Sequence, residues 1–167
     1  MEQQQIAYSQ VGIQQQVLPI LRHQGRSYHK QRNVFARIAR RAGQIETHTS
    51  DGKETVNRVR RGDFIVRNQT GAGETYVLTP EKFQVRYEWL RPGKGGFDEY
   101  CPIGHIIAVE LNRRTLEALG VSGDFTFVAP WGEPMIAKPG DFLASPPDFS
   151  EVYRIARKEF FETYAED

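Results

Sequence analysis

One cysteine and one histidine stand four residues apart in Cys101-Pro102-Ile103-Gly104-His105, a spacing that suggests nucleophilic chemistry. A thiolate reacts near neutral pH when a base or a positive charge lies beside it, and an imidazole can serve as either. Pro102 and Gly104 argue against a helix, so the spacing does not by itself bring the two side chains together. A half-buried cysteine and a solvent-facing histidine are the favoured interpretation.

Metal and phosphate-loop chemistry are poorly supported by the residue pattern. The histidines lack the spacing of a zinc site, and one cysteine does not build a structural zinc centre. These histidines are His23, His29, His48 and His105. Gly93-Lys94-Gly95-Gly96 lacks the complete phosphate-loop pattern and a following Ser or Thr, which favours a linker. We therefore expect no metal and no cofactor.

Asp63 and Asp141 each follow a glycine in matching contexts and invite comparison with a paired-carboxylate site. Aspartate after glycine in a turn usually accepts hydrogen bonds from nearby backbone amides. The turn role is favoured for both residues. With no nucleophile, base and orienting group that can be named together, an enzyme ranks behind a binding protein.

Basic residues are concentrated in one part of the chain. Arg22–Arg67 contains twelve Lys or Arg against four Asp or Glu, whereas Ser145–Asp167 contains three against six. A guanidinium presents a planar fork that suits phosphate and carboxylate groups, and aromatic residues interleaved with it can stack on a base. This segregation of charge predicts an anion-binding face.

The strand geometry selects which arginines share that face. If a hairpin forms around Asp51-Gly52, Arg58 and Arg60 lie two apart on one side of a strand, and Arg61 points to the other side. The predicted ligand-binding residues are Arg37, Arg58, Arg60 and Arg67. The competing interpretation is a solvated strand face whose charge is compensated by acidic residues elsewhere.

The elements that must position these residues come from one stretch that the chain uses twice. Arg61-Gly62-Asp63-Phe64-Ile65 returns as Pro139-Gly140-Asp141-Phe142-Leu143, and Glu-x-Tyr and Phe-x-x-x-Tyr follow both copies. The Gly-Asp pairs are 78 residues apart and the later landmarks 77 apart, so the copies differ by one loop residue. Six landmarks in one order indicate a duplication. The aromatic landmarks predicted to face inward are Phe64, Tyr76, Phe83 and Tyr87, matched by Phe142, Tyr153, Phe160 and Tyr164.

Each copy is predicted to contain a strand, a hairpin, a second strand and a short helix. Gly62-Asp63 predicts a turn that leads into a strand at Phe64–Val66, and Tyr76–Leu78 is the return strand. Thr79-Pro80-Glu81 predicts a helix N-terminus. The expected fold class is α+β and β-rich, with two tandem units of a small roll or SH3-like barrel type and a βα insert between them.

Composition and the positions of glycine and proline divide the chain into four predicted segments. Residues 1–29 form a glutamine-rich, loosely packed arm with an apolar anchor. Residues 30–90 form the first repeat, 91–124 a linker and the βα insert, and 125–167 the second repeat. Within the insert we expect a buried strand at 106–109 and a helix at 112–119 that Gly120 caps.

Global properties limit the protein class. The chain has 167 residues, 26% of them charged, and a net charge of +1, so no global field attracts nucleic acid or acidic lipid. A single cysteine excludes an internal disulfide. Without a signal pattern or an apolar run of about 20 residues, we expect a cytoplasmic protein with no membrane partner.

A family resemblance follows from the repeated motif. Lys138-Pro139-Gly140-Asp141-Phe142-Leu143 resembles the name-giving motif of the PGDYG domain, a family of small bacterial and phage proteins, with Phe for the usual Tyr and no second Gly. The first copy resembles it from Val34-Phe35-Ala36 through Gly62-Asp63-Phe64 to Phe83-x-x-x-Tyr87, with Arg61 in place of the proline. The resemblance covers about two thirds of the chain and implies a small β-rich fold, but it brings no catalytic residues.

Two functional hypotheses follow. The first is a non-catalytic binding module of bacterial or phage origin that captures an anionic ligand, either a nucleotide-like small molecule or a polyanion, on the arginine-rich face. The second is a protein–protein interaction or assembly module with no small-molecule ligand. A protein partner or a homo-oligomer fits the second hypothesis, and nucleic acid is left open under the first.

Overall fold

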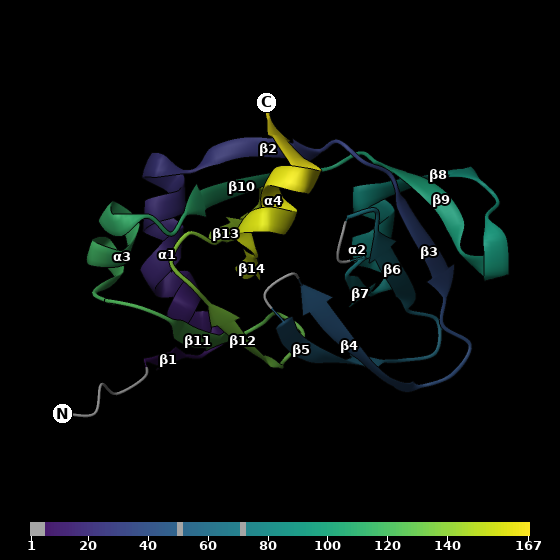
Figure 1. Cartoon of the computed structure of the whole chain (residues 1–167), viewed down its shortest axis with the longest axis horizontal. Helices are drawn as coiled ribbons and strands as arrows, with labels where there is room; N and C mark the ends of the chain where they lie inside the picture. The colour runs from purple at the N-terminus through teal and green to yellow at the C-terminus, as the bar shows by residue number, and fades with distance from the viewer. Residues whose placement is uncertain (1–5, 50–51, 71–72) are drawn as a thin grey trace. The chain divides into compact units, whose positions relative to one another are not determined.

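The computed structural model describes residues 6–49, 52–70 and 73–167 and has the predicted mixed, β-rich architecture (Figure 1). Its elements, in chain order, are β1 (Ala7–Tyr8), α1 (Gln10–Gln24), β2 (Arg26–Lys30), β3 (Val34–Ile38), β4 (Gly43–Thr49), β5 (Gly52–Val59), β6 (Phe64–Asn68), β7 (Thr75–Leu78), α2 (Pro80–Arg86), β8 (Tyr87–Arg91), the 3-10 turn η1 (Lys94–Gly96), β9 (Asp98–Pro102), β10 (His105–Glu110), α3 (Arg113–Leu119), β11 (Phe125–Val128), β12 (Pro134–Ala137), β13 (Phe142–Ser145), β14 (Tyr153–Ile155), α4 (Arg157–Thr163) and β15 (Tyr164–Glu166). The described strands form open sheets with two edges, so the SH3-like barrel alternative is wrong. No helix in the described ranges is both long and apolar enough to cross a membrane.

The chain forms two compact units. Unit 1 contains residues up to 28 together with 106–160 and residue 166, and unit 2 contains residues 29–105, 161–165 and 167. Unit 2 is therefore almost one continuous stretch, whereas unit 1 is assembled from both ends of the chain. This division separates the two copies of the repeated motif, because Gly62-Asp63 belongs to unit 2 and Gly140-Asp141 to unit 1.

Unit 2 is built on a five-stranded sheet in the order β7-β6-β3-β9-β8. One face carries an apolar cluster that includes Val34, Val66 and Phe83. On the other face, the hairpin of β4 and β5 contributes Val59, which packs with Ile65 of β6. The turn predicted at Ser50-Asp51 lies outside the described residues, but the pairing of β4 with β5 confirms the hairpin itself.

Helix α2 begins where the local sequence predicts and ends at Arg86, so Tyr87 lies in the following strand and not on the helix. The Thr79 side chain accepts a hydrogen bond from the backbone N–H of Lys82, and Pro80 occupies the first turn. Phe83 is buried and stacks on Phe64 with ring centroids 3.9 Å apart. The chain then continues directly into β8, a strand that the sequence pattern did not predict.

Unit 1 contains most of a second five-stranded sheet, in the order β14-β13-β10-β2-β15, and a smaller sheet in the order β1-β11-β12. Its core includes Leu111, Phe125, Phe127 and Leu143, all buried. Helix α3 has Asn112 as its N-cap and ends at Gly120 with φ +71°, as predicted. The left-handed conformation explains why glycine occupies that position.

The glutamine-rich segment is a structured part of unit 1, which corrects the prediction of a loosely packed arm over residues 1–16. Helix α1 begins after Ser9, whose side chain accepts a hydrogen bond from the N–H of Gly12. Ile13, Val17 and Leu21 recur every four residues and are at most 1% exposed. Glutamine is a good helix former, so low average hydropathy concealed an amphipathic helix. The Gln3–Gln5 run lies outside the described residues.

The two units share one architecture. Phe142 stacks on Phe160 in unit 1 at 3.6 Å between ring centroids, as Phe64 does on Phe83 in unit 2. Tyr28 meets Phe160 edge-on in unit 1, and Tyr100 meets Phe83 edge-on in unit 2. The two sheet orders correspond strand by strand, since β14, β13, β10, β2 and β15 occupy the places of β7, β6, β3, β9 and β8. The structure therefore extends the duplication to β3 and β10 and to β2 and β9.

The segment 91–96, predicted as a linker between the copies, lies inside unit 2. Strands β8 and β9 pair antiparallel, with Trp89 opposite Tyr100, and the segment is their connecting loop. The chain passes from unit 2 to unit 1 later, between His105 and Ile106. Glycine and proline mark the loop correctly, but a hairpin loop and an inter-unit linker share that composition.

Candidate anion-binding site

The candidate site is formed by two turns of unit 2 that are joined by hydrogen bonds. The N–H of Gly62 donates to the carbonyl of Ala39 at 2.9 Å, and the N–H of Ala39 donates to the carbonyl of Asp63 at 2.7 Å. Gly62 has φ +95°, a conformation that favours glycine. These bonds place the connection from β3 to β4 beside the connection from β5 to β6.

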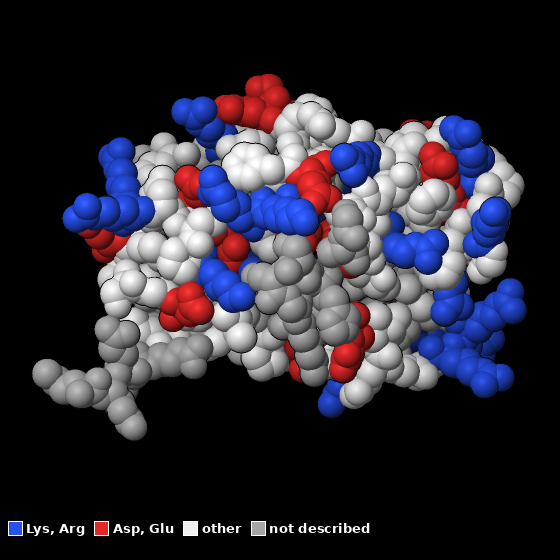
Figure 2. Space-filling view, viewed as in Figure 1, with Lys and Arg blue, Asp and Glu red and all other residues white. Residues whose placement is uncertain are grey.

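Each of these connections carries two consecutive arginines. All four side chains are exposed, and none forms a hydrogen bond or an ion pair with another described residue. We call this set the arginine cluster: Arg40, Arg41, Arg60 and Arg61. Figure 2 shows blue side chains protruding over the connection from β3 to β4, at the lower right, with no red beside them. Like charges on neighbouring turns repel one another, and together they give this part of the surface a positive electrostatic potential.

The equivalent turns of unit 1 provide an internal comparison. The N–H of Gly140 donates to the carbonyl of Leu111 at 2.9 Å, and the N–H of Leu111 donates to the carbonyl of Asp141 at 2.7 Å. These two bonds repeat those of unit 2. The side chains differ, because Asn112 and Arg113 follow Leu111 and the Gly-Asp pair follows Lys138-Pro139. Arg113 is paired with Glu117 at 3.1 Å. The backbone of the site is therefore duplicated, but its charge is not.

Two predicted ligand residues, Arg37 and Arg67, are brought together elsewhere on the sheet of unit 2. The ring of Phe97 lies under both guanidiniums, 5.2 Å from the Cζ of Arg37 and 4.6 Å from that of Arg67. The buried Nε of Arg37 has no hydrogen-bond partner among the described residues. The nearby carboxylate of Glu99 accepts a bond from Asn33 at 2.8 Å and lies 3.8 Å from Arg91. This pair of arginines is thus held in place without being neutralised.

The other two predicted residues, Arg58 and Arg60, lie on or next to β5. Val59 is buried against Ile65 of the sheet, and Arg58 and Arg60 on either side of it are exposed. Because side chains alternate along a strand, Arg58 points away from the sheet face that carries Arg37. Arg60 joins the arginine cluster. The structure thus brings Arg37 and Arg67 together, places Arg60 in the arginine cluster and leaves Arg58 outside both groups.

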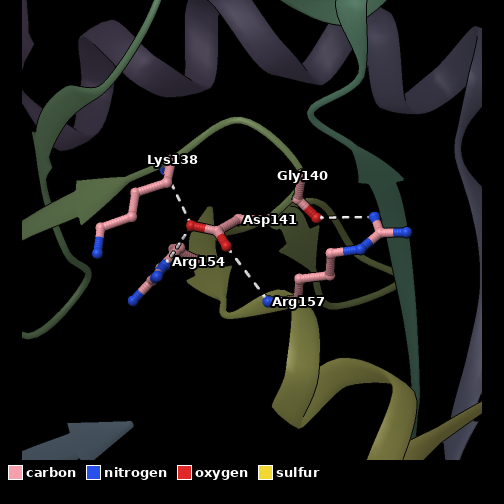
Figure 3. A network of polar contacts seen from close by, with 5 residues as sticks. All are labelled: Lys138, Gly140, Asp141, Arg154 and Arg157. Atoms are coloured by element: carbon pink, nitrogen blue, oxygen red, sulfur yellow. Dashed lines mark hydrogen bonds and ion pairs between the residues drawn. The ribbon is translucent and has the colours of Figure 1, made fainter. Parts of the chain in front are cut away.

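The two aspartates of the repeat have the turn role that the sequence favoured. Asp63 accepts the N–H of Arg60 at 2.9 Å, and Asp141 accepts that of Lys138 at 2.8 Å. Asp141 also accepts the Nε of Arg154 at 2.8 Å and the N–H of Arg157 at 3.2 Å (Figure 3). Both side chains of the Asp141–Arg154 pair are buried, 6% and 2% exposed. Both carboxylates therefore have structural roles in their turns.

Cys101 and His105 do not form the suggested reactive pair. Cys101 is half-buried in β9 and its thiol makes no hydrogen bond within the described residues, whereas the Nδ1 of His105 lies 2.8 Å from Asp167. The other oxygen of Asp167 is 2.6 Å from the Nδ1 of His29. Within the described ranges no group of three His, Cys, Asp or Glu has the geometry of a metal site.

A second polar cluster of unit 2 surrounds Lys30. Its ammonium donates to Asn68 at 3.2 Å, to the hydroxyl of Tyr76 at 2.6 Å and to that of Tyr87. The two tyrosine hydroxyls are themselves 2.6 Å apart. Burial, with a smaller contribution from Tyr87, raises the pKa of Tyr76 well above its usual value of 10. The phenol of Tyr76 therefore stays neutral, and both tyrosine hydroxyls accept hydrogen bonds from the lysine, which is a structural role.

Comparison with known proteins gives no further guide to the site. No family model matches the chain, and neither the curated proteins nor the solved structures contain a match. The resemblance to the PGDYG domain stays a prediction based on the residues quoted above.

Sequence reasoning found the basic segment and missed how its members are grouped. Arg40 and Arg41 were visible only as charged residues between two strands, because nothing local shows that their turn bonds to the Gly62 turn. A usable signal was present in the repeat. Arg60 and Arg61 directly precede Gly62, where the second copy has Lys138 and Pro139, so the difference between the copies marks the site.

Proposed function

We propose that the protein is a non-catalytic module that binds an anionic ligand through the arginine cluster. The observation that carries the proposal is the set of four exposed guanidiniums on two hydrogen-bonded turns, with no ion-pair partner among the described residues. Phosphate is the best-matched ligand group because a guanidinium can donate two parallel bonds to it.

The comparison between the two units favours a functional origin of the charge. Both units keep the Gly-Asp turn and its backbone bonds, to Ala39 in unit 2 and to Leu111 in unit 1, so the turn itself does not require arginine. A cluster of unpaired like charges raises the free energy of the folded state, and a bound anion removes that repulsion. Stability alone thus explains the duplicated backbone but not the arginines of unit 2.

The test is a set of titrations at low salt with two double variants. Arg60→Ala with Arg61→Ala removes half of the arginine cluster and keeps the backbone bond from residue 60 to Asp63. Arg113→Ala with Lys138→Ala makes the matched change at the equivalent turns of unit 1. Binding of ATP, short-chain polyphosphate and a 20-nucleotide single strand is followed by calorimetry or fluorescence anisotropy.

We expect the unit 2 variant to bind the tightest of these ligands at least about tenfold more weakly than the wild type, which corresponds to about 1.4 kcal/mol. The unit 1 variant should remain within about twofold. If the wild type binds nothing tighter than about millimolar, the arginine cluster is only a solvated surface and the proposal fails. An equal loss in both variants would also contradict it, since net charge alone would then explain the binding.

A further inference from the structure

Unit 2 holds its unneutralised arginines at two places along the same strand, not one. Arg37 lies in β3 and Arg67 lies opposite Phe35 of β3, whereas the arginine cluster begins just beyond the end of that strand. Arg37 is paired with Ile65, and Ile65 packs beneath Val59 of the hairpin whose ends carry the cluster. Both groups of arginines therefore lie next to the contact between Ile65 and Val59.

The separation of the two groups follows from strand geometry. A strand advances about 3.3 Å per residue, so position 35, opposite Arg67, lies about 10 Å from the end of β3 at Ile38, beyond which the arginine cluster begins. The phosphates of one nucleotide lie much closer together than this. One strand of a nucleic-acid duplex presents a phosphate about every 3.4 Å along the helix axis, so about three phosphates pass over the same length.

The packing around Phe97 fixes the guanidiniums of the first group. Cation–π contacts hold Arg37 and Arg67 against one ring, and neither side chain forms an ion pair with another described residue. Phe35 also lies beneath Arg67, at 5.8 Å from its Cζ. Because these aromatic faces are already used by guanidiniums, they are not free to stack on bases. The two rings are thus not available as stacking platforms, and the guanidiniums over them offer positive charge to a phosphate backbone.

We infer that the ligand of the proposed anion-binding site is the phosphodiester backbone of a nucleic acid, held jointly by the arginine cluster and by Arg37 with Arg67, without sequence preference. This inference rests on the proposed function and adds the class of the ligand and two binding residues to it. The backbone of a single strand and that of a duplex share the required chemistry.

The experiment measures the affinity of the full chain for a 20-nucleotide single strand, the corresponding 20-base-pair duplex and ATP between 25 and about 200 mM salt. The probe variant is Arg37→Gln with Arg67→Gln, which removes two charges at similar side-chain length. Arg67→Gln alone is included because Arg67 is exposed and its loss should not impair folding. The control is Arg113→Ala with Arg114→Ala, which removes two charges from the exposed side of α3 in unit 1.

We expect the wild type to bind one of the 20-mers at least about tenfold more tightly than ATP, and scrambled sequences equally well. In the probe variant the slope of log K against log salt should become shallower by about 1.8 for the duplex or about 1.4 for the single strand, and by half as much for Arg67→Gln. The control should keep the wild-type slope. The nucleic acid with the larger affinity identifies which form is the ligand.

Two results would overturn the inference and leave the proposed function standing. One is ATP binding as tight as that of either 20-mer. The other is an unchanged salt slope in both Arg67→Gln and the double variant, while Arg60→Ala with Arg61→Ala still loses binding. An absence of binding to all three ligands at the lowest salt would refute this inference, and if short-chain polyphosphate also fails to bind, it would refute the proposed function itself.

Discussion

At the scale of single residues, the duplicated aspartate shows how one position acquires different roles. Asp63 and Asp141 make the same bond to the amide three residues earlier, yet only Asp141 is also paired with a buried arginine. The position of Arg154 in the second copy is held by Val77 in the first. A buried guanidinium needs its carboxylate much more than the turn does, because an unpaired buried charge is costly.

The first prediction follows from this difference. Asp141→Asn leaves Arg154 buried beside a neutral partner, and we expect the free energy of unfolding to fall by about 3–5 kcal/mol. Asp63→Asn is the matched control and should cost about 1 kcal/mol or less, because the amide oxygen can still accept the turn bond. Urea unfolding followed by circular dichroism measures both. Equal losses would mean that the Arg154 pair contributes nothing beyond the turn.

The second prediction concerns the stability of the protein at alkaline pH. Burial holds the pKa of Tyr76 above its value in the unfolded chain, which is about 10. The unfolded state therefore loses the phenolic proton first, so stability is complete below about pH 10 and declines as the pH rises above it. Tyr76→Phe should cost about 1 kcal/mol at pH 8 through lost hydrogen bonds.

The diagnostic readout is the difference in unfolding free energy between pH 9 and pH 11, which should be smaller in Tyr76→Phe than in the wild type. Absorbance at 295 nm should show one phenol of the wild type ionising only with unfolding, and this step should vanish in the variant. If both proteins lose the same stability over this interval, ionisation of Tyr76 does not limit the alkaline stability of the fold.

At the scale of elements, helix α1 changes the meaning of the glutamine-rich segment. Its buried stripe contributes to the core of unit 1, and the side chain of Gln10 donates to the carbonyl of Val128 at 2.7 Å and accepts from the N–H of Val152 at 2.8 Å. The Gln10 side chain thus joins the helix to β11 and to the segment before β14, both of which are distant in the sequence. The segment is a structural element of the unit and not an appendage.

The third prediction tests that conclusion. Leu21→Ala removes a side chain that is 1% exposed and should lower the free energy of unfolding by about 2–5 kcal/mol. Gln16→Ala, at an exposed position of the same helix, should stay within about 0.5 kcal/mol of the wild type. Thermal and urea unfolding provide the measurement. If Leu21→Ala is as stable as the Gln16→Ala control, the interpretation of this segment as a loosely packed arm is supported instead.

At the scale of the whole molecule, the duplication gives each unit its own aromatic stack. Phe83 belongs to the core of unit 2, and Phe160 holds the equivalent place in unit 1. Phe83 contacts the rings of Phe64 and Tyr100 in unit 2, and Phe160 contacts those of Tyr28 and Phe142 in unit 1, so damage at one stack should loosen that unit first. Local opening of this kind is common in proteins with separate cooperative units.

The fourth prediction compares the two stacks by hydrogen exchange. Phe83→Ala and Phe160→Ala should each cost about 3–5 kcal/mol. We expect Phe83→Ala to accelerate amide exchange mainly in β3, β6 and β9, and Phe160→Ala mainly in β10, β13 and α1. Phe161→Ala is the control, because that ring is 58% exposed. Identical exchange patterns in the two core variants would show that the units unfold as one.

The sequence by itself determined the features that depend on neighbouring residues. The Gly-Asp turns, the cap of α2 at Thr79 and the end of α3 at Gly120 follow from local hydrogen bonding and from the backbone freedom of glycine. The aromatic landmarks of both copies are buried or half-buried, as the repeated pattern predicts. These are the parts of the fold that a linear pattern can encode.

Tertiary structure alone decided how distant segments meet. No periodicity indicates that β2 joins the sheet of unit 1 or that β9 joins that of unit 2, since pairing between strands distant in the chain depends on the whole core. The arginine cluster depends on the bonds between Ala39 and the Gly62 turn, which join positions more than twenty residues apart. Because Arg37 and Arg67 meet over Phe97 whereas Arg60 joins the arginine cluster, the charge visible in the sequence becomes two separate groups only in the folded chain.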